Sequence, residues 1–538
     1  MSKESKRRPP KVKQFSELEA NDFLNILSES DSIPDVYVQF AKSLVDGNAW
    51  INEELERGTL TIARLRKLFK IQGSEKASNR KRNSQSKSKG SKSNFPPKGH
   101  GRNGADAYHG ADIVDVVHPE YSPGDICPEL ECGGRLYEMT DPGVVVRVSG
   151  APLASATRYQ LQKLRCAICE VIYTATLPEG VSSKKYDEGF VAMLMINKYF
   201  MSVPLYRQDR LQKYLGMPLP SSTQWDLMVA HEPMLKALHE ALLADAANGL
   251  ALCYDDTSVK ILTEIQAKKA AQQGEKSKHT CFNTGIVSLH QDHHTYIYMA
   301  DNNTAGQFMG EVLELRDPDL DLPVVMCDAL SSNIPQQISE DLYILCYCLV
   351  HARRKFYELP DGYDDLADEV IRMIGHIYDN EKDARKMEPD KRLSYHKKHS
   401  KPIMDKLKSY LEEQSNVFEP NGVAGKAINY MLKRWTNLSG FLQHANAPID
   451  NNITERALKL VIQTRKSSMF YKSLKSAAFA SFVQSALYTA AQNNIDPCKY
   501  MQDLLENESS VMADPAAWLP WIYQSTLKQT RAKSAKLG

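Results

Sequence analysis

The chain has 538 residues, of which 42% are hydrophobic and 25% are charged, and its formal net charge is +1. Single hydrophobic cores stop growing at roughly 250–300 residues, so this length predicts three or four domains. The balanced charge does not by itself indicate a nucleic-acid-binding protein, and the local distribution of charge is the better guide. No window reaches the roughly 18 apolar residues that span a bilayer, and the N-terminus MSKESKRRPPKVKQF lacks the apolar segment of a signal peptide. We therefore expect a cytoplasmic protein with no membrane partner, whose ten cysteines are thiols or metal ligands.

The first two segments differ in periodicity. Residues 1–75 contain FSELEANDFLNILSE and AWINEELERGTLTIARLRKLFKIQ, whose apolar positions recur three and four apart and predict a small helical region. Residues 76–104 are rich in Lys, Arg and Ser without any period, which predicts a flexible basic linker. Such a linker can hold phosphates loosely, or it can be a solvated tether, and the sequence leaves both open.

Residues 105–180 carry short β-like runs and four paired cysteines. Cys127 and Cys132 lie in CPELECGG, and Cys166 and Cys169 form a C-x-x-C in RCAICE. Two close pairs joined by a longer loop are typical of a structural tetrahedral Zn(II) site, which would replace the core that so short a segment cannot build. We predict a zinc-ribbon-like module, and the alternative is four unrelated buried cysteines.

Residues 181–248 read as helices with one sharp break. In YRQDRLQKYLGMPLPSSTQWDLM a helix is expected to end near Leu215, Gly216 suits its C-cap, and a second helix is expected to start after a cap at Ser221 or Ser222. This pattern predicts a helix-turn-helix-like DNA-binding region, with an ordinary helical hairpin as the alternative. The candidate DNA contacts are Arg207, Arg210, Lys213, Thr223 and Gln224.

The remainder of the chain predicts a mixed α/β sheet followed by helices. Residues 249–354 hold five short β-like runs (ALCYDD, CFNTGIVSLH, HTYIYMAD, PVVMCDA and LYILCYCLVH), with a probable helix, GQFMGEVLELR, between the third and fourth. Residues 355–445 are almost purely helical and highly charged, 446–510 give further helices, and 511–538 form a C-terminal tail.

Acidic residues stand where apolar strands end. Asp255 and Asp256 follow ALCY, and Asp328 follows PVVMC. A carboxylate in a buried strand is costly unless it binds a cation or a partner, and oxygen ligands suit Mg(II) or Mn(II). Glu455 opens a helix in APIDNNITERALKLVIQTRK, where it has two structural alternatives: a capping box with Asn452, or an ion pair with Lys459. Three carboxylates holding two metal ions would suit reactions at a phosphodiester.

Several separate segments resemble the large transposase of the insertion-sequence 66 family, which is of the DDE type with a ribonuclease-H-like core. They are PPKGHGRNGA, the paired cysteines, INKYFMSVPLYRQDRLQKYLGMPLPSSTQWDLM, DDTSVKIL, HARRKFYEL, and DNNITERALK with the segments that follow it. The match runs from about residue 95 to about residue 506. Asp256 stands where the family often has Glu, the first cysteine pair is looser than the usual C-x-x-C, and the segment after Asp328 lacks the family's usual glycine or aromatic residues.

The resemblance implies a multidomain α+β protein whose ribonuclease-H-like core comprises residues 249–354 and 446–510, interrupted by a helical insertion at 355–445. It implies that Asp255, Asp328 and Glu455 are the catalytic carboxylates that hold two Mg(II) or Mn(II) ions, although Asp255 and Asp256 stay alternatives for the first position. It also favours a DNA-contacting role for the cationic cluster after the last strand, with further candidates later in the chain. These residues are His351, Arg353, Arg354, Lys355, Arg465 and Lys466.

The function implied is binding of double-stranded DNA at the ends of a bacterial mobile element, strand cleavage, and transfer of the new 3′ end to target DNA. Joining two ends predicts a homo-oligomer that is nucleoid-associated when bound, and small accessory proteins of the same element are candidate partners. Two rivals stay open: a relic that binds DNA without catalysis, and a metal-dependent nuclease without joining activity.

Overall fold

A computed structural model describes residues 119–126, 134–138, 154–165, 172–271 and 281–537, together with scattered positions between 23 and 45. The chain divides into two compact units, Met1–Val146 and Arg147–Gly538. The basic linker at 76–104 and most of the expected N-terminal helices lie outside the described residues. So do the four paired cysteines, Cys127, Cys132, Cys166 and Cys169, and their zinc site stays a prediction.

The chain on either side of each cysteine pair forms antiparallel contacts. In the first unit Ile126 bridges Arg135, and the Leu136 N–H donates to the Asp125 carbonyl oxygen at 2.8 Å. In the second unit strand β1 (Lys163–Arg165) pairs with β2 (Ile172–Thr174). In the chain, residues 127–134 therefore follow one paired residue and precede the other, and residues 166–171 connect β1 to β2.

A five-stranded mixed sheet forms the centre of the second unit, as the sequence predicted. Its strands are β3 (Ala251–Val259), β4 (Cys281–Leu289), β5 (His294–Asp301), β6 (Val324–Cys327) and β7 (Ile344–Tyr347). The spatial order is β5-β4-β3-β6-β7; β3, β4 and β5 are antiparallel neighbours, and β6 and β7 run parallel to β3. The β6 residues are all buried, as expected for a parallel strand with both faces covered.

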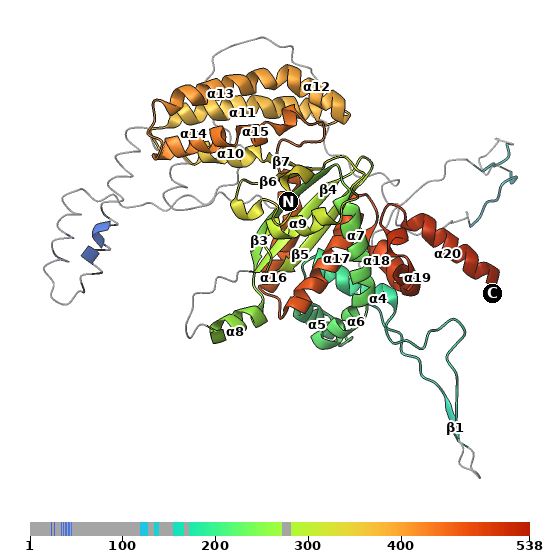
Figure 1. Cartoon of the computed structure of the whole chain (residues 1–538). Coiled ribbons are helices and arrows are strands. Elements are labelled where there is room, and N and C mark those ends of the chain that lie inside the picture. The colour runs from blue at the N-terminus through green and yellow to red at the C-terminus, as the bar shows by residue number, and fades with distance from the viewer. Residues whose placement is uncertain are drawn as a thin grey trace. The chain divides into compact units, whose positions relative to one another are not determined.

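Helices cover the two faces of this sheet (Figure 1). On the face of Leu252 and Tyr254, helices α7 (Glu232–Ala247) and α9 (Ala305–Glu314) pack against β3, β4 and β5. On the opposite face, α16 (Asn452–Ser468) packs against β3 and β4. Thr304 caps α9 through a full capping box with Gln307, which fixes where that helix begins.

Helix α17 (Leu474–Gln492) closes the outer edge of the sheet with its hydroxyl groups. The β5 backbone N–H groups of Tyr296, Tyr298 and Ala300 donate to hydroxyl oxygens on α17. The acceptors are Thr489, Ser485 and Ser481. Four helical residues rise about 6 Å and two strand residues about 6.6 Å, so the two repeats nearly match. This helix thus satisfies an edge strand that would otherwise be open to another chain.

Residues between the last strand and α16 are helical, as predicted. After α10 (Leu349–Tyr357) come α11 (Asp364–Ala384), α12 (Pro389–His399), α13 (Lys401–Ser415), α14 (Val423–Lys433) and α15 (Trp435–Leu438). They pack on one another, and α15 contacts β7 (Figure 1). Their buried apolar residues, such as Ile374, Leu407 and Ile428, belong to the same core as the sheet.

Further helices precede and follow this core. The first ones are α4 (Glu188–Met195), the π-helical turn η2 (Ile196–Phe200), α5 (Leu205–Tyr214) and α6 (Ser221–Val229), and α8 (Leu262–Ala271) follows β3. The last ones are α18 (Pro497–Glu506), α19 (Glu508–Ala513) and α20 (Tyr523–Leu537). The predicted C-terminal tail is therefore helical; Trp518 within it is 1% exposed and lies in a short 3-10 turn that packs on α7. No described helix is both long and apolar enough to cross a membrane.

Candidate active site

Asp255 lies in the middle of β3 and Asp328 directly follows β6, so the expectation that both aspartates stand at strand ends is right only for Asp328. The parallel register pairs Ala251 with Val324 and Cys253 with Met326, and two more steps along the chain bring Asp255 level with Asp328. Neighbouring strands are about 4.8 Å apart, so the two aspartates lie close together on one face of the sheet. The apolar runs before each aspartate are the buried strands that place them there.

Glu455 reaches the same place from helix α16. Asp255 is directly opposite Gly285 on β4, and paired residues share a face of the sheet. A Cβ added at Gly285 would lie 2.9 Å from Leu458 Cδ2, so α16 covers this face. Glu455 is three residues before Leu458, on the same side of the helix. The absent side chain at Gly285 lets α16 lie close to the sheet on the face of Asp255.

The start of α16 is anchored beside the first aspartate. Asn451 is fully buried, its Nδ2 donates to the Tyr254 carbonyl oxygen at 2.8 Å, and its backbone N–H donates to Cys348 Sγ at 3.3 Å. The N-cap is Asn451, without a side-chain capping bond, so the alternative of a capping box between Asn452 and Glu455 is wrong.

The imidazole of His351 lies between two of the carboxylates. Its Nδ1 is 3.9 Å from Asp328 Oδ2 and its Nε2 is 3.4 Å from Glu455 Oε1. The His351 side chain is 15% exposed. The hydrogen bond with Glu455 raises the pKa of His351, burial opposes this, and Asp328 adds to the rise. Sequence reasoning placed His351 in a DNA-contacting cluster, which stays a prediction, and the structure places its ring beside Asp328 and Glu455.

The surroundings of Asp255 disfavour the ionised form of its carboxyl group. Burial raises its pKa to about 7; the Asp256 N–H bond lowers it, the charge of Asp328 raises it further and His351 lowers it. Burial disfavours a carboxylate that no cation balances. A divalent ion beside Asp255 would reverse this penalty, and carboxylate oxygens are the ligands that Mg(II) and Mn(II) prefer. In the described part of the chain, the ligand atoms of Asp255, Asp328 and Glu455 do not all lie within 4.8 Å of one another.

Asp256 points to the other face of β3. Residues alternate along a strand, and Asp256 accepts a hydrogen bond from the backbone N–H of Ala305, the first residue of α9. Burial raises its pKa, and that hydrogen bond opposes the rise. Asp256 is therefore occupied at the start of a helix, on the face away from Glu455.

Asn333 is a residue of this site that sequence reasoning missed. It is 1% exposed, and its Nδ2 donates to Asp328 Oδ1 at 2.8 Å. The Tyr254 hydroxyl donates to the Asn333 carbonyl oxygen, and the Leu330 N–H also donates to Asp328 Oδ1, at 3.1 Å. These bonds fix the orientation of the second carboxylate. The available signal in the sequence was the asparagine five positions after Asp328, in MCDALSSN.

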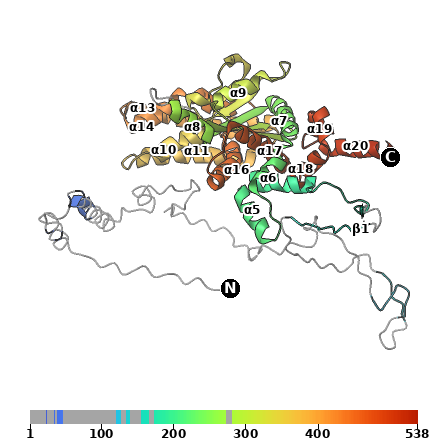
Figure 2. The ribbon, with the colours of Figure 1, turned by 90° about the horizontal axis from the view of Figure 1, so that it is seen from below.

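The predicted helix-turn-helix residues lie on α5 and α6, which contact each other (Figure 2). Helix α6 also contacts α4. Gly216 has φ +75°, as its place after α5 requires. Pro220 is the N-cap of α6 and no side chain caps that helix, so the expected cap by Ser221 or Ser222 is wrong. Gln224 is fully buried, and its Nε2 donates to the carbonyl oxygens of Leu219 and Leu205. It holds the turn together and does not face DNA.

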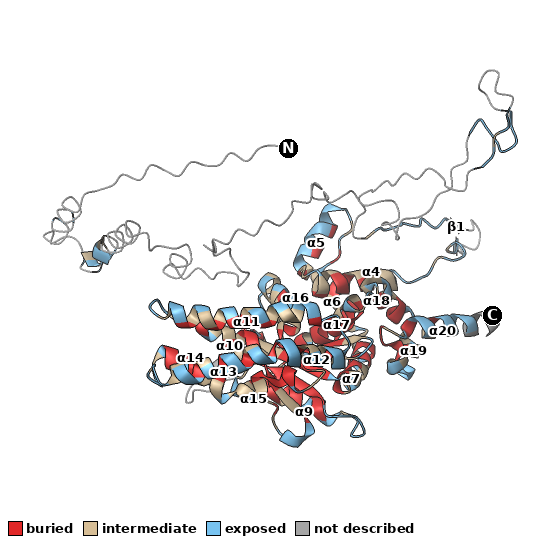
Figure 3. Ribbon diagram, turned by 90° about the horizontal axis from the view of Figure 1, so that it is seen from above, coloured by how far each residue is buried: buried red, intermediate tan, exposed pale blue. Residues whose placement is uncertain are grey.

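The basic candidates differ in their surroundings. Arg207, Arg210 and Lys213 are exposed on α5, which is among the most exposed helices of the unit (Figure 3). Thr223 is half-buried on α6. Arg465 Nη1 donates to Thr257 Oγ1 at 2.9 Å and to the Ser258 carbonyl oxygen. It therefore ties the end of α16 to β3.

The cationic residues on α10 also differ in their surroundings. The charge of Arg354 lowers the pKa of Glu455 in addition to the larger effect of His351. Arg353 lies within electrostatic range of Tyr378. Lys355 Nζ is 5.4 Å from the centre of the Tyr430 ring, and Lys355 is exposed, as is Lys466 on α16.

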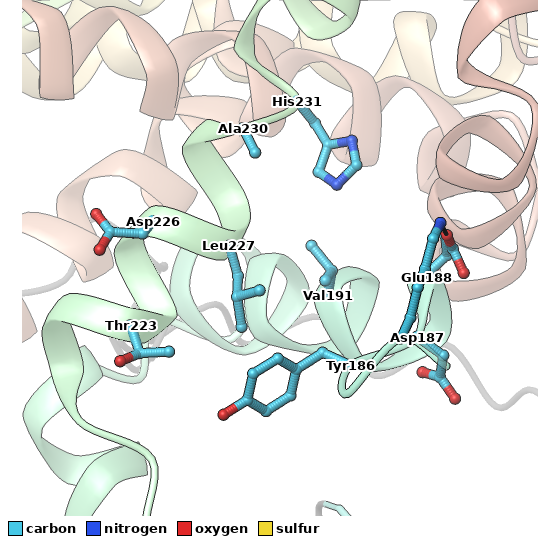
Figure 4. Close-up of a pocket in the computed structure, with 10 residues that line it drawn as sticks. Tyr186, Asp187, Glu188, Val191, Thr223, Asp226, Leu227, Ala230 and His231 are labelled. Atoms are coloured by element: carbon cyan, nitrogen blue, oxygen red, sulfur yellow. Dashed lines mark hydrogen bonds and ion pairs between the residues drawn. The ribbon is translucent and has the colours of Figure 1, made fainter. Parts of the chain in front are cut away.

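A pocket of about 340 Å³ lies elsewhere, between α4 and α6 (Figure 4). Tyr186 and Val191 face Leu227 across it, and Asp226 and His231 stand at its rim. Glu188, which also lines the pocket, forms an ion pair with Lys184, whose Nζ is 2.7 Å from Glu188 Oε1. None of the three carboxylates lines this pocket, and it is distinct from the candidate active site.

Comparison with known proteins identifies the family of this chain. Residues 184–478 match the model of the Transposase IS66 family, a span that begins before α4, ends within α17 and includes all three carboxylates. Because the match covers more than half of the chain, the chain belongs to this family.

Among individual proteins, the chain is similar to three from Sinorhizobium fredii (strain NBRC 101917 / NGR234). It is 26% identical to uncharacterized protein y4jD over 63% of this chain and 66% of that protein. It is 24% identical to uncharacterized protein y4hP, over 64% of this chain and 63% of that protein. For uncharacterized protein y4qI the values are 24%, 63% and 62%. The chain thus spans slightly less than two thirds of the length of these relatives.

Proposed function

We propose that this chain is a DNA transposase of the DDE type in which Asp255, Asp328 and Glu455 form the active site of a ribonuclease-H-like core. The observation that carries this proposal is that His351 lies between Asp328 and Glu455, while the charges of Asp328 and His351 both act on Asp255. Membership of the IS66 transposase family supports the reaction class.

Each of the three carboxylates has a separate role in this proposal. Two divalent ions held here would activate the attacking oxygen and neutralise the leaving oxygen of a phosphodiester. Asp255 supplies a desolvated carboxylate at the centre, and Asp328 lies next to it in an orientation fixed by Asn333. Glu455 closes the site from the helix that Asn451 anchors. Asp255 is favoured over Asp256 because only its side chain faces α16.

Exposed cations provide the means of holding DNA. Arg207, Arg210 and Lys213 recur three residues apart on α5, so they project from one side of the helix. We propose that they contact phosphates, together with Lys355 and Lys466, while Arg353 and Arg354 act nearer the carboxylates. The four paired cysteines remain a proposed Zn(II) module for recognition of the element ends.

The reaction determines further expectations. Two element ends must be joined to one target, so the active form is proposed to be an oligomer. Small accessory proteins of the same element remain candidate partners. The expectation of an oligomer comes from the chemistry of joining two ends.

A strand-transfer assay with full-length protein, element-end DNA and Mn(II) tests the proposal. Asp328→Asn should reduce joined product at least about 100-fold, because charge needed in the transition state is lost. Binding of the end DNA should stay within about twofold of wild type. Asp255→Asn should behave like Asp328→Asn, whereas the matched control Asp256→Asn should retain most activity, since its amide oxygen still accepts from Ala305.

Two other outcomes would identify the rival functions. Wild-type protein that binds end DNA but yields no cleaved or joined product would be a DNA-binding protein without catalysis. Protein that cleaves but never joins pre-nicked ends with a free 3′-hydroxyl would be a metal-dependent nuclease. Equal losses in Asp255→Asn and Asp256→Asn would contradict the assignment of Asp255.

A further inference from the structure

A second group of metal-ligating side chains lies at the opposite end of the sheet from the carboxylates. Asp245 is near the end of α7, and His290 and His293 lie in the turn between β4 and β5. Within the described ranges, these three are the set of His, Cys, Asp and Glu side chains whose ligand atoms all lie within 4.8 Å of one another. Leu289 pairs with Ala251, four residues before Asp255, so about 13 Å of strand separates this cluster from the candidate active site.

The spacing of the ligand atoms fits a tetrahedral ion. Asp245 Oδ2 is 3.2 Å from His290 Nε2 and 3.3 Å from His293 Nε2. Zinc bonds to imidazole nitrogen and carboxylate oxygen are about 2.0–2.1 Å long, which places two tetrahedral ligands about 3.3 Å apart. Two imidazoles and one carboxylate are also a donor set that suits Zn(II).

The surrounding groups orient these ligands as the outer partners of a metal site do. Asp292 Oδ1 is 2.8 Å from His293 Nδ1, the ring nitrogen that faces away from Asp245. A carboxylate on the far nitrogen fixes which nitrogen of the ring is left to bind a metal. The His293 ring stacks on His290, with ring centres 4.2 Å apart, and on Trp521, with ring centres 3.7 Å apart. Because the two imidazole planes are nearly parallel, one ring must turn for both Nε2 atoms to bind the same ion. The three ligands are only 10–18% exposed.

Hydrogen bonds already join the same side chains in the metal-free protein. His290 Nε2 is 3.2 Å from Asp245 Oδ2, His293 Nε2 is 3.3 Å from each of the two carboxylate oxygens, and the Thr295 hydroxyl donates to Oδ2. Burial raises the pKa of Asp245, but hydrogen bonds from His290, His293 and Thr295 outweigh it and hold the pKa well below its usual value. A bound ion would take the place of the two imidazole donors at this carboxylate.

We propose that Asp245, His290 and His293 bind one Zn(II), with the fourth position left to water. The ion joins the β4–β5 turn to the end of α7, next to Trp521, which precedes α20. It is independent of the Mg(II) or Mn(II) chemistry proposed for the carboxylates and of the four paired cysteines.

The test counts zinc in the purified full-length protein. Metal-free protein is loaded with Zn(II) in the presence of excess Mg(II), which competes for oxygen-ligand sites, and the bound zinc per chain is measured. The double variant His290→Gln/His293→Gln keeps amide donors that can still hydrogen-bond Asp245 but loses the imidazole ligands. It should bind one zinc fewer per chain than wild type, whereas the control His294→Ala, at the neighbouring position, should match wild type.

Co(II) spectroscopy provides a second measurement that does not depend on the double variant. In protein that carries Cys166→Ser/Cys169→Ser, bound Co(II) should give visible bands that disappear when Asp245→Asn is added. Zinc content equal to wild type in the double glutamine variant would overturn the proposal. So would Co(II) bands in the cysteine variant that survive Asp245→Asn, or a cysteine variant that gives no bands at all.

Discussion

Asp255 and Asp256 are neighbours in the chain but belong to opposite faces of β3. Asp255 shares its face with Gly285 and the helix that carries Glu455, and Asp256 accepts from the start of α9. The alternation of side chains along a strand separates two residues that composition and spacing alone leave equivalent. His351 joins the site in a similar way, because its position on α10 places it between Asp328 and Glu455.

His351 is expected to be a positioning residue for the two carboxylates that it touches. We predict that His351→Ala lowers strand transfer about 10–100-fold and raises the Mn(II) concentration needed for half-maximal activity. Mn(II) titrations of strand transfer, with end-DNA binding measured in parallel, would check this. The exposed His376 of α11 is the control, and His376→Ala should not change either quantity. A loss of DNA binding as large as the loss of transfer would instead support the DNA-contacting role suggested by the sequence.

At the scale of elements, the distance between α16 and the sheet depends on Gly285. A Cβ at this position would lie 2.9 Å from Leu458 Cδ2 and 3.2 Å from its Cγ, closer than normal packing permits. The helix is also held at its two ends, by Asn451 and by Arg465. The position of Glu455 therefore depends on a glycine that lies on another element.

Gly285→Val should move α16 outward, lower the free energy of unfolding by about 1–3 kcal/mol, and reduce strand transfer more than end binding. Adding Leu458→Ala should recover part of both losses, because it vacates the space that valine needs. Thermal unfolding and strand transfer of the single and double variants measure this coupling. Gly375 in α11 has nothing within 4 Å of an added Cβ, so Gly375→Ala should stabilise the protein slightly. Strictly additive effects of Gly285→Val and Leu458→Ala would contradict this packing.

At the scale of the whole molecule, His239 lies where α7, the edge strand β5 and α17 meet. It is 2% exposed, its Nε2 is 3.2 Å from the Tyr298 carbonyl oxygen, and its ring centre is 5.0 Å from that of Phe482. Burial lowers the pKa of His239 to about 4, and the bond to Tyr298 opposes this. His239 is therefore protonated less readily in the folded protein than in the unfolded chain, where the pKa of histidine is about 6.5.

The stabilisation from neutral His239 is present above pH of about 6.5 and is lost as the pH falls toward 4. Between pH 6.5 and 5 the loss amounts to about 1.5 kcal/mol. His239→Gln, which cannot be protonated, should show a smaller fall in the thermal unfolding midpoint over this interval than wild type. Identical pH slopes for the two proteins would exclude His239 as a source of acid sensitivity.

The sequence by itself determined the five strands and most helices, because these follow from short-range patterns of apolar residues. It also placed both aspartates at strand ends from the cost of burying them, which is right for Asp328 and wrong for Asp255 in the middle of β3. Its resemblance to a transposase family led to Glu455, which spacing alone left ambiguous. Only the tertiary structure decided that Asp255 faces α16, that His351 lies beside Asp328 and Glu455, that Gln224 is buried, and that Asp245, His290 and His293 converge. Such contacts join residues far apart in the chain, and their geometry depends on the register of strands and the packing of helices, which no local pattern encodes.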